Sequence, residues 1–211
     1  MPINAIEAPR EPASPAARHR EAESASAHPL ALADLSRLPR LGLRGNTAAA
    51  RLAAEGFAIP DAPNRLSRAA SGETLLRLSR NEYLLLGAPA DEGERVRALE
   101  TALPKAGENG LYFLPRQDSH AWFQLSGPRR AEVMAKLCGV DLSPAAFARD
   151  AVAQTSVARI DAIVASDGGP LTDDPAAGAF HLLFDRASAA YFREALLDAM
   201  REFGGGSVGF T

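Results

Sequence analysis

The same order of strand-like and helix-like segments occurs twice along this 211-residue chain, and this repetition constrains the fold more than any single motif. Gly45 and Gly127 each follow a leucine-ended segment and open an Ala/Arg-rich segment, and they lie 82 positions apart. The apolar triplets that end at Leu86 and Phe184 occupy equivalent final strands and lie 98 positions apart. The difference of 16 positions is about the length of a polar insertion around Gly168.

Two duplicated halves, at about residues 41–103 and 118–203, are therefore expected. The first half is predicted to contain a helix at 47–55, strands at 74–78 and 82–86 around a tight turn, and a helix at 90–103. The second is predicted to contain a strand at 121–125, a helix from Pro128 to Gly139, strands at 154–160, 162–165 and 179–184, and a helix at 186–203. This alternation predicts an α+β fold, a mostly antiparallel sheet with helices on one face.

Residues 1–29 differ from the rest of the chain. They hold five prolines, eight alanines and seven charged residues, with no aromatic residue, Leu or Val. Such a segment buries too little apolar surface to offset the cost of ordering the chain. We expect a disordered tail that could wrap along a partner, followed by a single domain at 30–211.

Composition excludes several classes of protein. No apolar run approaches the ~20 residues that a membrane helix needs, and the N-terminus has no apolar signal core. A net charge of −3 with dispersed basic residues argues against a nucleic-acid binder. A lone cysteine, Cys138, precludes an internal disulfide and fits a reducing compartment. We therefore expect a cytoplasmic protein with neither nucleic-acid nor membrane partners.

Asp118, Ser119 and His120 stand side by side just before a predicted strand. A hydrolytic triad is a tempting interpretation, but triads are assembled from separated segments, because neighbouring strand residues point to opposite faces. The favoured interpretation is structural: the short polar side chains cap the turn, and His120 donates to a backbone carbonyl.

Other chemistry-bearing residues also favour structural interpretations. His181 is interpreted as an ordinary sheet histidine with polar or edge-facing neighbours, and Cys138 as core filler. Asp167 and the pair Asp173-Asp174 are interpreted as solvated turn residues. The four scattered histidines show no metal-ligand spacing, and no dinucleotide or Walker motif occurs. We therefore predict no catalytic, cofactor-binding or metal site in this chain.

Several short motifs together resemble the gamma subunit of heterotetrameric sarcosine oxidase, a family that includes the corresponding subunit of N-methylglutamate dehydrogenase-type enzymes. They are Asp118-Ser119-His120, then LSGPRR at 125–130, CGVDL at 138–142, AQT at 153–155 and ARI at 158–160, with PDAPN at 60–64 and LSRNEYLL at 78–85 upstream. Within them, Asp118, Ser119, His120, Ser126, Gly127 and Pro128 are taken as the structural family motif.

That family is similar in turn to the folate-binding aminomethyltransferase of the glycine cleavage system, which shares an Asp-x-Ser-His … Ser-Gly-Pro segment. Here the first part is shortened to residues 117–120. The full transferases are longer and build their folate cavity from three domains. The resemblance therefore implies a fold retained for assembly rather than for catalysis.

The resemblance also implies a setting in one-carbon metabolism. A large alpha chain would bind NAD and folate, a beta chain would carry flavins and oxidise the N-methyl amino acid, and a small delta chain would bind zinc. The gamma chain would hold no cofactor and would support the assembly of this oxidoreductase. The alternative is a free-standing folate-dependent one-carbon enzyme or folate-binding protein, with Asp118, Asp173 or Asp174 in an acid–base role.

Overall fold

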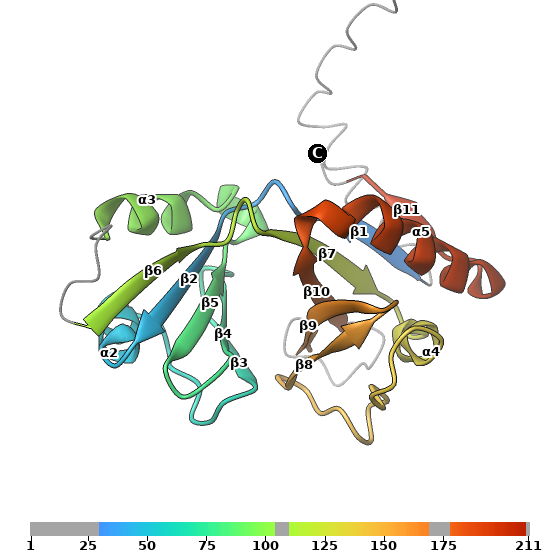
Figure 1. Cartoon of the computed structure of the whole chain (residues 1–211), viewed down its shortest axis with the longest axis horizontal. Coiled ribbons are helices and arrows are strands. Elements are labelled where there is room, and N and C mark those ends of the chain that lie inside the picture. Colours follow the sequence, from blue (N-terminus) through green and yellow to red (C-terminus); the bar gives the residue numbers. More distant parts are fainter. Residues whose placement is uncertain (1–29, 104–109, 169–177, 210–211) are drawn as a thin grey trace, which may run out of the picture.

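The computed structural model describes residues 30–103, 110–168 and 178–209, so the predicted tail at 1–29 lies outside the described residues (Figure 1). The strands are β1 (Ala31–Asp34), β2 (Arg40–Gly45), β3 (Arg65–Arg68), β4 (Thr74–Arg77), β5 (Glu82–Leu86), β6 (Leu111–Pro115), β7 (His120–Ser126), β8 (Val152–Val157), β9 (Ile160–Asp167), β10 (Ala179–Asp185) and β11 (Gly206–Val208). The α-helices are α2 (Ala48–Ala54), α3 (Glu94–Ala102), α4 (Arg130–Ala135) and α5 (Ala189–Met200). Short 3₁₀ turns lie at Pro89–Asp91, Arg186–Ser188 and Arg201–Phe203.

The strands form two sheets. Sheet A has the order β11-β1-β7-β10-β9-β8, and sheet B has the order β3-β4-β5-β2-β6. Neighbouring strands are antiparallel except for the parallel pair β1 and β11. The α+β class and the mostly antiparallel pairing are thus confirmed, with the strands divided between two sheets.

The internal repeat is visible in the topology. The first half runs β1-β2-α2-β3-β4-β5-α3, and the second runs β6-β7-α4-β8-β9-β10-α5. The first strand of each half, here called its lead strand, pairs in the sheet formed by the other half: β1 pairs with β7 in sheet A, and β6 pairs with β2 in sheet B. The two halves therefore exchange their lead strands, and the five repeated strands of each sheet follow the same order.

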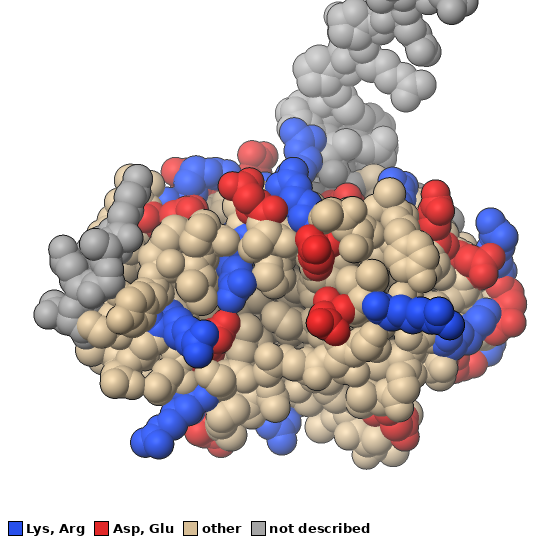
Figure 2. All heavy atoms as spheres, in the orientation of Figure 1, with Lys and Arg blue, Asp and Glu red and all other residues tan. Residues whose placement is uncertain are grey.

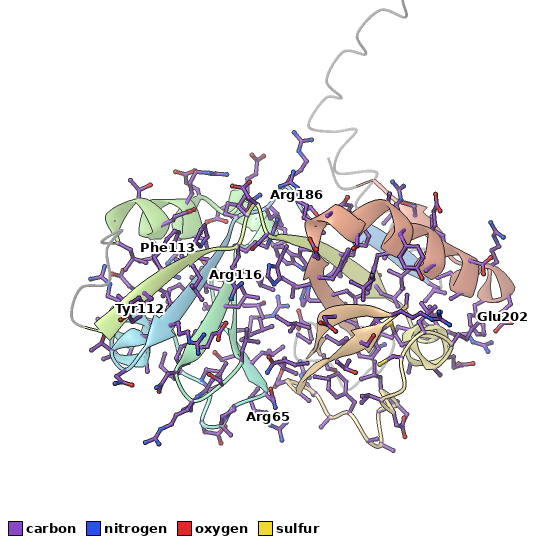
Figure 3. All side chains as sticks on the ribbon, in the orientation of Figure 1. Arg65, Tyr112, Phe113, Arg116, Arg186 and Glu202 are labelled. Atoms are coloured by element: carbon purple, nitrogen blue, oxygen red, sulfur yellow. The ribbon has the colours of Figure 1, made fainter. Side chains whose placement is uncertain are left out.

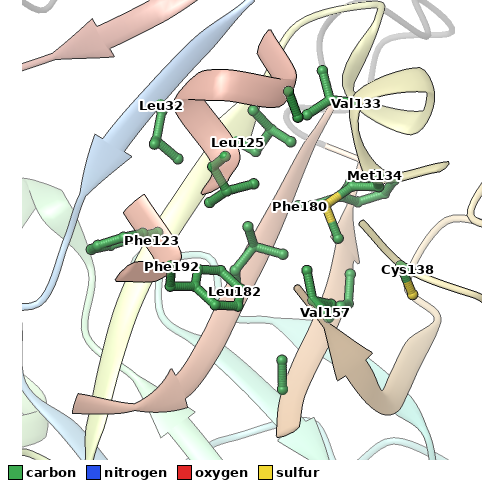
Figure 4. Packing of buried hydrophobic residues seen from close by; sticks show 14 of the residues in the cluster. Leu32, Phe123, Leu125, Val133, Met134, Cys138, Val157, Phe180, Leu182 and Phe192 are labelled. Carbon is green, nitrogen blue, oxygen red and sulfur yellow. The ribbon is translucent and has the colours of Figure 1, made fainter. Parts of the chain in front are cut away.

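Three apolar clusters fill the layers between these elements. One lies between sheet A and helices α4 and α5, and includes Phe123, Met134 and Phe192 (Figure 4). A second lies between sheet B and helices α2 and α3, and includes Leu52 and Val96. The third lies between the two sheets, so each sheet has its helices on one face and the other sheet on its opposite face.

Coverage on both faces explains the uninterrupted apolar runs in the sheet centres. The triplets that end at Leu86 in β5 and Phe184 in β10 are buried throughout, as expected for strands enclosed on both sides. The inter-sheet cluster draws on both strands, through Leu84 and Leu86 from β5 and Leu183 from β10. Of the described helices, none is long and apolar enough to span a membrane.

Two details differ from the predicted elements. The strand predicted at 154–160 turns at Ala158 and Arg159, whose φ angles of 49° and 67° are left-handed and give the tight β8–β9 hairpin. Neither residue is a glycine, so the usual turn signal is missing. The helix predicted from Pro128 to Gly139 is shorter, because α4 begins at Arg130 and ends at Ala135.

Candidate functional site at the junction of the sheets

The chain crosses between the sheets at two neighbouring places. Residues 35–39 lead from β1 in sheet A to β2 in sheet B, and residues 116–119 lead from β6 back to β7. The second crossing holds Asp118 and Ser119 of the predicted motif, and His120 begins β7. In Figure 3, Arg116 and Arg186 mark this junction over the middle of the molecule.

A buried arginine fastens the two crossings together. Arg40, which is 1% exposed, donates from Nη1 to the carbonyl oxygens of Ser36 (3.0 Å) and Leu38 (2.8 Å) in the first crossing. From Nη2 it donates to the carbonyl oxygens of Gln117 (3.0 Å) and His120 (2.6 Å), and Nε also donates to His120 (3.1 Å). Burial, with a smaller effect of Arg186, lowers the pKa of Arg40 to about 10, so it stays charged near neutral pH.

The His120 ring lies against the Ser119 hydroxyl. The two are joined at 2.9 Å through Nδ1, and the hydroxyl also donates to the Pro115 carbonyl oxygen at 3.2 Å. Because that carbonyl can only accept, the hydroxyl proton is committed to it, and Nδ1–H donates to the hydroxyl oxygen. The Nε2 atom of a neutral ring then carries the lone pair. The predicted hydrogen bond from His120 to a backbone carbonyl is thus replaced by a relay through Ser119.

The electrostatics of the junction keep His120 neutral. Burial, Arg116 and Arg40, in that order, lower the pKa of this ring, and they outweigh the opposing effects of Asp185 and Glu82. Arg116 is itself paired with Glu82 at 2.9 Å. A neutral imidazole with a free lone pair can accept a hydrogen bond or a proton.

Asp118 does not complete a catalytic relay. Its side chain is 96% exposed and lies 3.9 Å from Arg186, and within the described part of the chain no hydrogen bond or ion pair joins it to His120. The backbone of the turn is used instead: the His120 N–H donates to the Arg116 carbonyl oxygen (3.1 Å), and the Arg186 N–H donates to that of Ser119 (3.1 Å). These three motif residues therefore shape a turn between the sheets.

The second part of the motif ends β7. The Ser126 hydroxyl lies 3.5 Å from the Ala31 carbonyl oxygen, which ties β7 to the lead strand β1. Gly127 is buried with a φ of 114°, a conformation that side-chain-bearing residues rarely adopt. Its carbonyl oxygen accepts hydrogen bonds from the Arg130 N–H (3.3 Å) and from Arg130 Nη1 (2.9 Å). Pro128 follows on the surface, just before α4.

A cavity of about 340 Å³ adjoins His120 on the strands of sheet A. It is lined by His120, Gln154, Thr155, Asp161, Ala162, Ile163 and Leu183. The Gln154 amide already donates to the Asn64 side chain (2.9 Å) and the Leu78 carbonyl oxygen (2.7 Å), so it ties sheet A to sheet B. The cavity offers hydrogen-bond acceptors beside apolar side chains, but His120 has no acid–base partner here among the described contacts.

A second polar group, which sequence reasoning missed, is buried between the sheets. The Trp122 indole N–H donates to His181 Nδ1 (3.0 Å), His181 Nε2 lies 3.1 Å from Asp167 Oδ2, and Arg68 forms an ion pair with the same carboxylate. Since Nδ1 accepts from Trp122, the His181 proton is on Nε2 and is donated to Asp167. Burial, and to a smaller extent Arg68, lower the pKa of His181 to about 3.

This group corrects two predictions. His181 is not at a sheet edge, because β10 lies between β7 and β9 and the residue is 3% exposed; its polar neighbours, Trp122 and Asp167, are buried with it. Asp167 is not a solvated turn residue, because it is 4% exposed and ends β9. Asp173 and Asp174 lie outside the described residues. Trp122 and His181 are brought together by the register of β7 and β10, which no local sequence pattern indicates.

The sheets also meet along their other edges. The Leu66 N–H donates to the Asp150 carbonyl oxygen and the Val152 N–H donates to that of Asn64, both at 2.9 Å. Arg65, labelled in Figure 3, forms an isolated bridge with Ala151. The inter-sheet core is therefore closed by backbone contacts on this side and by the Arg40 junction on the other.

Metal-binding and thiol chemistry find little support in the described part of the chain. Among those residues, no three His, Cys, Asp or Glu side chains are grouped closely enough to hold a metal ion. Cys138 is a free, buried thiol in the apolar cluster beneath α4 (Figure 4). On the face in Figure 2, acidic and basic side chains are interspersed.

Comparison with known proteins shows what the chain resembles. No protein-family model matches it. It is 28% identical over 211 residues to the sarcosine oxidase subunit gamma of Corynebacterium sp. (strain U-96), a match that covers 98% of this chain and 97% of that protein. A chain of the heterotetrameric sarcosine oxidase from Corynebacterium sp. U-96, solved in complex with pyrrole 2-carboxylate, matches with a TM-score of 0.65 and 28% identity, covering 93% of this chain and 98% of that chain.

A more distant likeness concerns the fold alone. Glycine cleavage system aminomethyltransferase T from Bartonella henselae matches with a TM-score of 0.60 at 16% identity, covering 85% of this chain and 47% of that chain. The present chain therefore spans about half the length of the transferase. Both resemblances expected from the sequence motifs are confirmed.

Proposed function

Because the chain resembles the sarcosine oxidase gamma subunit over almost its whole length, we propose that it is the non-catalytic structural (gamma) subunit of a multi-subunit, flavin-dependent N-methyl amino acid oxidase or dehydrogenase. The observation that carries the proposal is the two-sided coverage, 98% of this chain and 97% of its relative. The chain has a structural role in the assembly, and the reactive groups lie in other subunits.

The geometry of the motif supports a structural role. Ser119 and His120 are bonded to each other and to the turn, and Asp118 points to solvent beside Arg186. Ser126, Gly127 and Pro128 close β7 onto β1 and lead into α4. The buried His181 is hydrogen-bonded to Trp122 and Asp167, which favours a structural role over a reactive one.

The proposal extends to the organisation of the complex. Residues 30–211 form a single gamma-like domain of two related halves, and residues 1–29 are a tail that is disordered or wraps along a partner. The partners are alpha, beta and delta subunits in the cytoplasm, which hold the flavins, NAD, folate and zinc. The present chain holds none of these cofactors, and its own contribution is to the assembly.

Co-expression with the neighbouring reading frames, followed by affinity capture of this chain, tests the proposal. The captured material should contain larger subunits and absorb as a flavoprotein, whereas the chain purified alone should be colourless. Capture of no flavin-containing partner contradicts the proposal, as does a flavin spectrum from the isolated chain.

Calorimetry separates this function from the free-standing folate-binding alternative, for which the transferase-like fold is the supporting observation. A structural subunit should show no heat of binding when the isolated chain is titrated with tetrahydrofolate. A folate protein should bind with at least micromolar affinity, about −8 kcal/mol. In that case Asp118 would be the first described residue to substitute.

A further inference from the structure

The exchanged lead strands occupy equivalent positions, but their outer edges differ. Strand β1 pairs with β7 on one side, and β11 covers its other side as a parallel strand, with Ala31 opposite Gly206 and Ala33 opposite Val208. Strand β6 pairs with β2 on one side. Within residues 30–103, 110–168 and 178–209, no strand pairs with the outer side of β6, which ends sheet B.

The direction of the backbone shows which groups this edge presents. The Gly45 N–H donates to the Asn81 carbonyl oxygen at 2.8 Å, so odd-numbered residues of β2 bond toward β5 and even-numbered ones toward β6. Arg44 lies opposite Tyr112 in the register, so the N–H and C=O of Tyr112 are bonded inward. The N–H and C=O of Phe113, the next residue, therefore point outward.

The side chains leave the edge attractive to another strand. Residues 111–115 read Leu-Tyr-Phe-Leu-Pro, without a charge, and Tyr112 is 57% exposed. Exposed edges are ordinarily protected by charged residues, proline, bulges or covering elements. Strand β6 has a proline only at its last residue, Pro115, and no charge, so the remainder of its edge invites strand pairing. Figure 3 shows Tyr112 and Phe113 at the outer end of sheet B, away from the junction between the sheets.

We propose that the outer edge of β6 binds an extended segment of a partner subunit as an added parallel strand, in the position that β11 takes on β1. This inference rests on the proposed function, because it assigns a surface to the assembly. The occupant is expected to resemble β11, whose Gly206-Ser207-Val208 is short, small and uncharged. Main-chain hydrogen bonds would give affinity, and the exposed face of Tyr112 would give an apolar contact.

The connections of two internal segments argue against either of them as the added strand. Residues 104–109 connect α3 to β6 itself, and a parallel neighbour needs a connection of about a dozen residues or more. Residues 169–177 join β9 to β10 in the other sheet. The tail at 1–29 is long enough, so the experiment below treats it as a separate outcome.

A matched pair of substitutions tests the proposal in the co-expressed complex. Phe113→Ala and Phe113→Pro both remove the ring, but only the proline variant also removes the outward N–H, while the inward bonds of Tyr112 remain. The amount of partner subunit captured with Phe113→Pro should be at least about tenfold lower than with Phe113→Ala, because the edge loses a donor and gains an obstructing ring. The two purified variants should have equal melting temperatures. Equal retention by the two variants overturns the proposal.

Hydrogen exchange of the unsubstituted protein supplies a test that needs no variant. The Phe113 N–H should exchange rapidly in the isolated chain and should be protected in the complex. Protection in the isolated chain that disappears when residues 2–29 are deleted would identify the tail as the occupant, and protection that depends on chain concentration would identify a second copy; either result overturns the proposal. If the wild-type chain captures no partner at all, the proposed function fails first, and the two failures are therefore distinct.

Discussion

Two buried polar groups join the sheets, and they differ in what satisfies them. Arg40 is bonded to four backbone carbonyl oxygens, those of Ser36, Leu38, Gln117 and His120. In the His181 group, side chains bond to one another, from Trp122 through His181 and Asp167 to Arg68. The first therefore depends on the course of the chain, and the second on the protonation state of its members.

The Arg40 junction and the His181 group therefore differ in their sensitivity to pH. A guanidinium offers five donors in a fixed plane, and backbone carbonyls cannot titrate, so the Arg40 junction is stable across the neutral range. His181 must remain neutral because it accepts from Trp122, and its lowered pKa makes protonation costly. Substitution and pH should therefore separate the two.

The largest effect is expected at the Arg40 junction. Arg40→Leu leaves buried carbonyl oxygens from both crossings without donors, and we expect the free energy of unfolding to fall by about 4 kcal/mol in urea titrations. Arg40→Lys, which keeps the charge but has fewer donors, should recover part of this loss. A loss below about 1 kcal/mol for the leucine variant would mean that the junction contributes little.

Removing the carboxylate of the second group should cost less. Asp167→Ala leaves the His181 N–H and the half-exposed Arg68 without this partner, and we expect a loss of about 3 kcal/mol. In an Arg68→Met background the same substitution should cost less, because one unpaired charge is already gone. Additive losses in this double-mutant cycle would contradict a coupled group.

Acid should weaken the second group, and the lowered pKa of the half-buried His120 adds a pH dependence beside the first. Below pH ~6.5 the unfolded chain protonates His181, whereas the folded chain, with a pKa of about 3, does not. Stability is therefore lost as the pH falls, by about 2 kcal/mol between pH 7 and pH 5. His181→Gln, which cannot titrate, should show a correspondingly smaller pH dependence in urea titrations, while Arg40→Lys should keep the wild-type dependence.

The smallest effect is expected at Asp118. Its side chain is 96% exposed and only loosely paired with Arg186, so Asp118→Asn should change stability by no more than about 0.5 kcal/mol. Amine oxidation by the assembled enzyme should also stay at the wild-type level. A large loss of turnover with intact assembly would show that the junction takes part in the chemistry after all.

The parts of the fold that follow local patterns were predictable from the sequence. Strands β4 and β5, with their turn at 79–81, and the long helix α5 have strong periodicity and clear ends. Strands β1, β6 and β11 were missed because their partners lie far along the chain. Strand β3 was also missed: it pairs with the neighbouring strand β4 but spans only four residues. The His181 group was missed for a similar reason, since it exists only when β7, β9 and β10 take their register.

The motif around His120 was located but only partly explained. Its interpretation as a turn agrees with the geometry, whereas the role of Arg40, far upstream in sequence, carried no local signal. Arginine at the start of a strand is ordinarily a surface residue. Its burial follows from the meeting of two crossings that no single segment encodes.

The exchange of lead strands has a consequence for how this molecule can come apart. Each half supplies a strand to the other half's sheet, so neither half by itself contains all five repeated strands of one sheet. A single cut in the peptide between α3 and β6 would accordingly release no free lobe: the two fragments would stay interlocked through β1 and β6, and would separate only when both sheets melt.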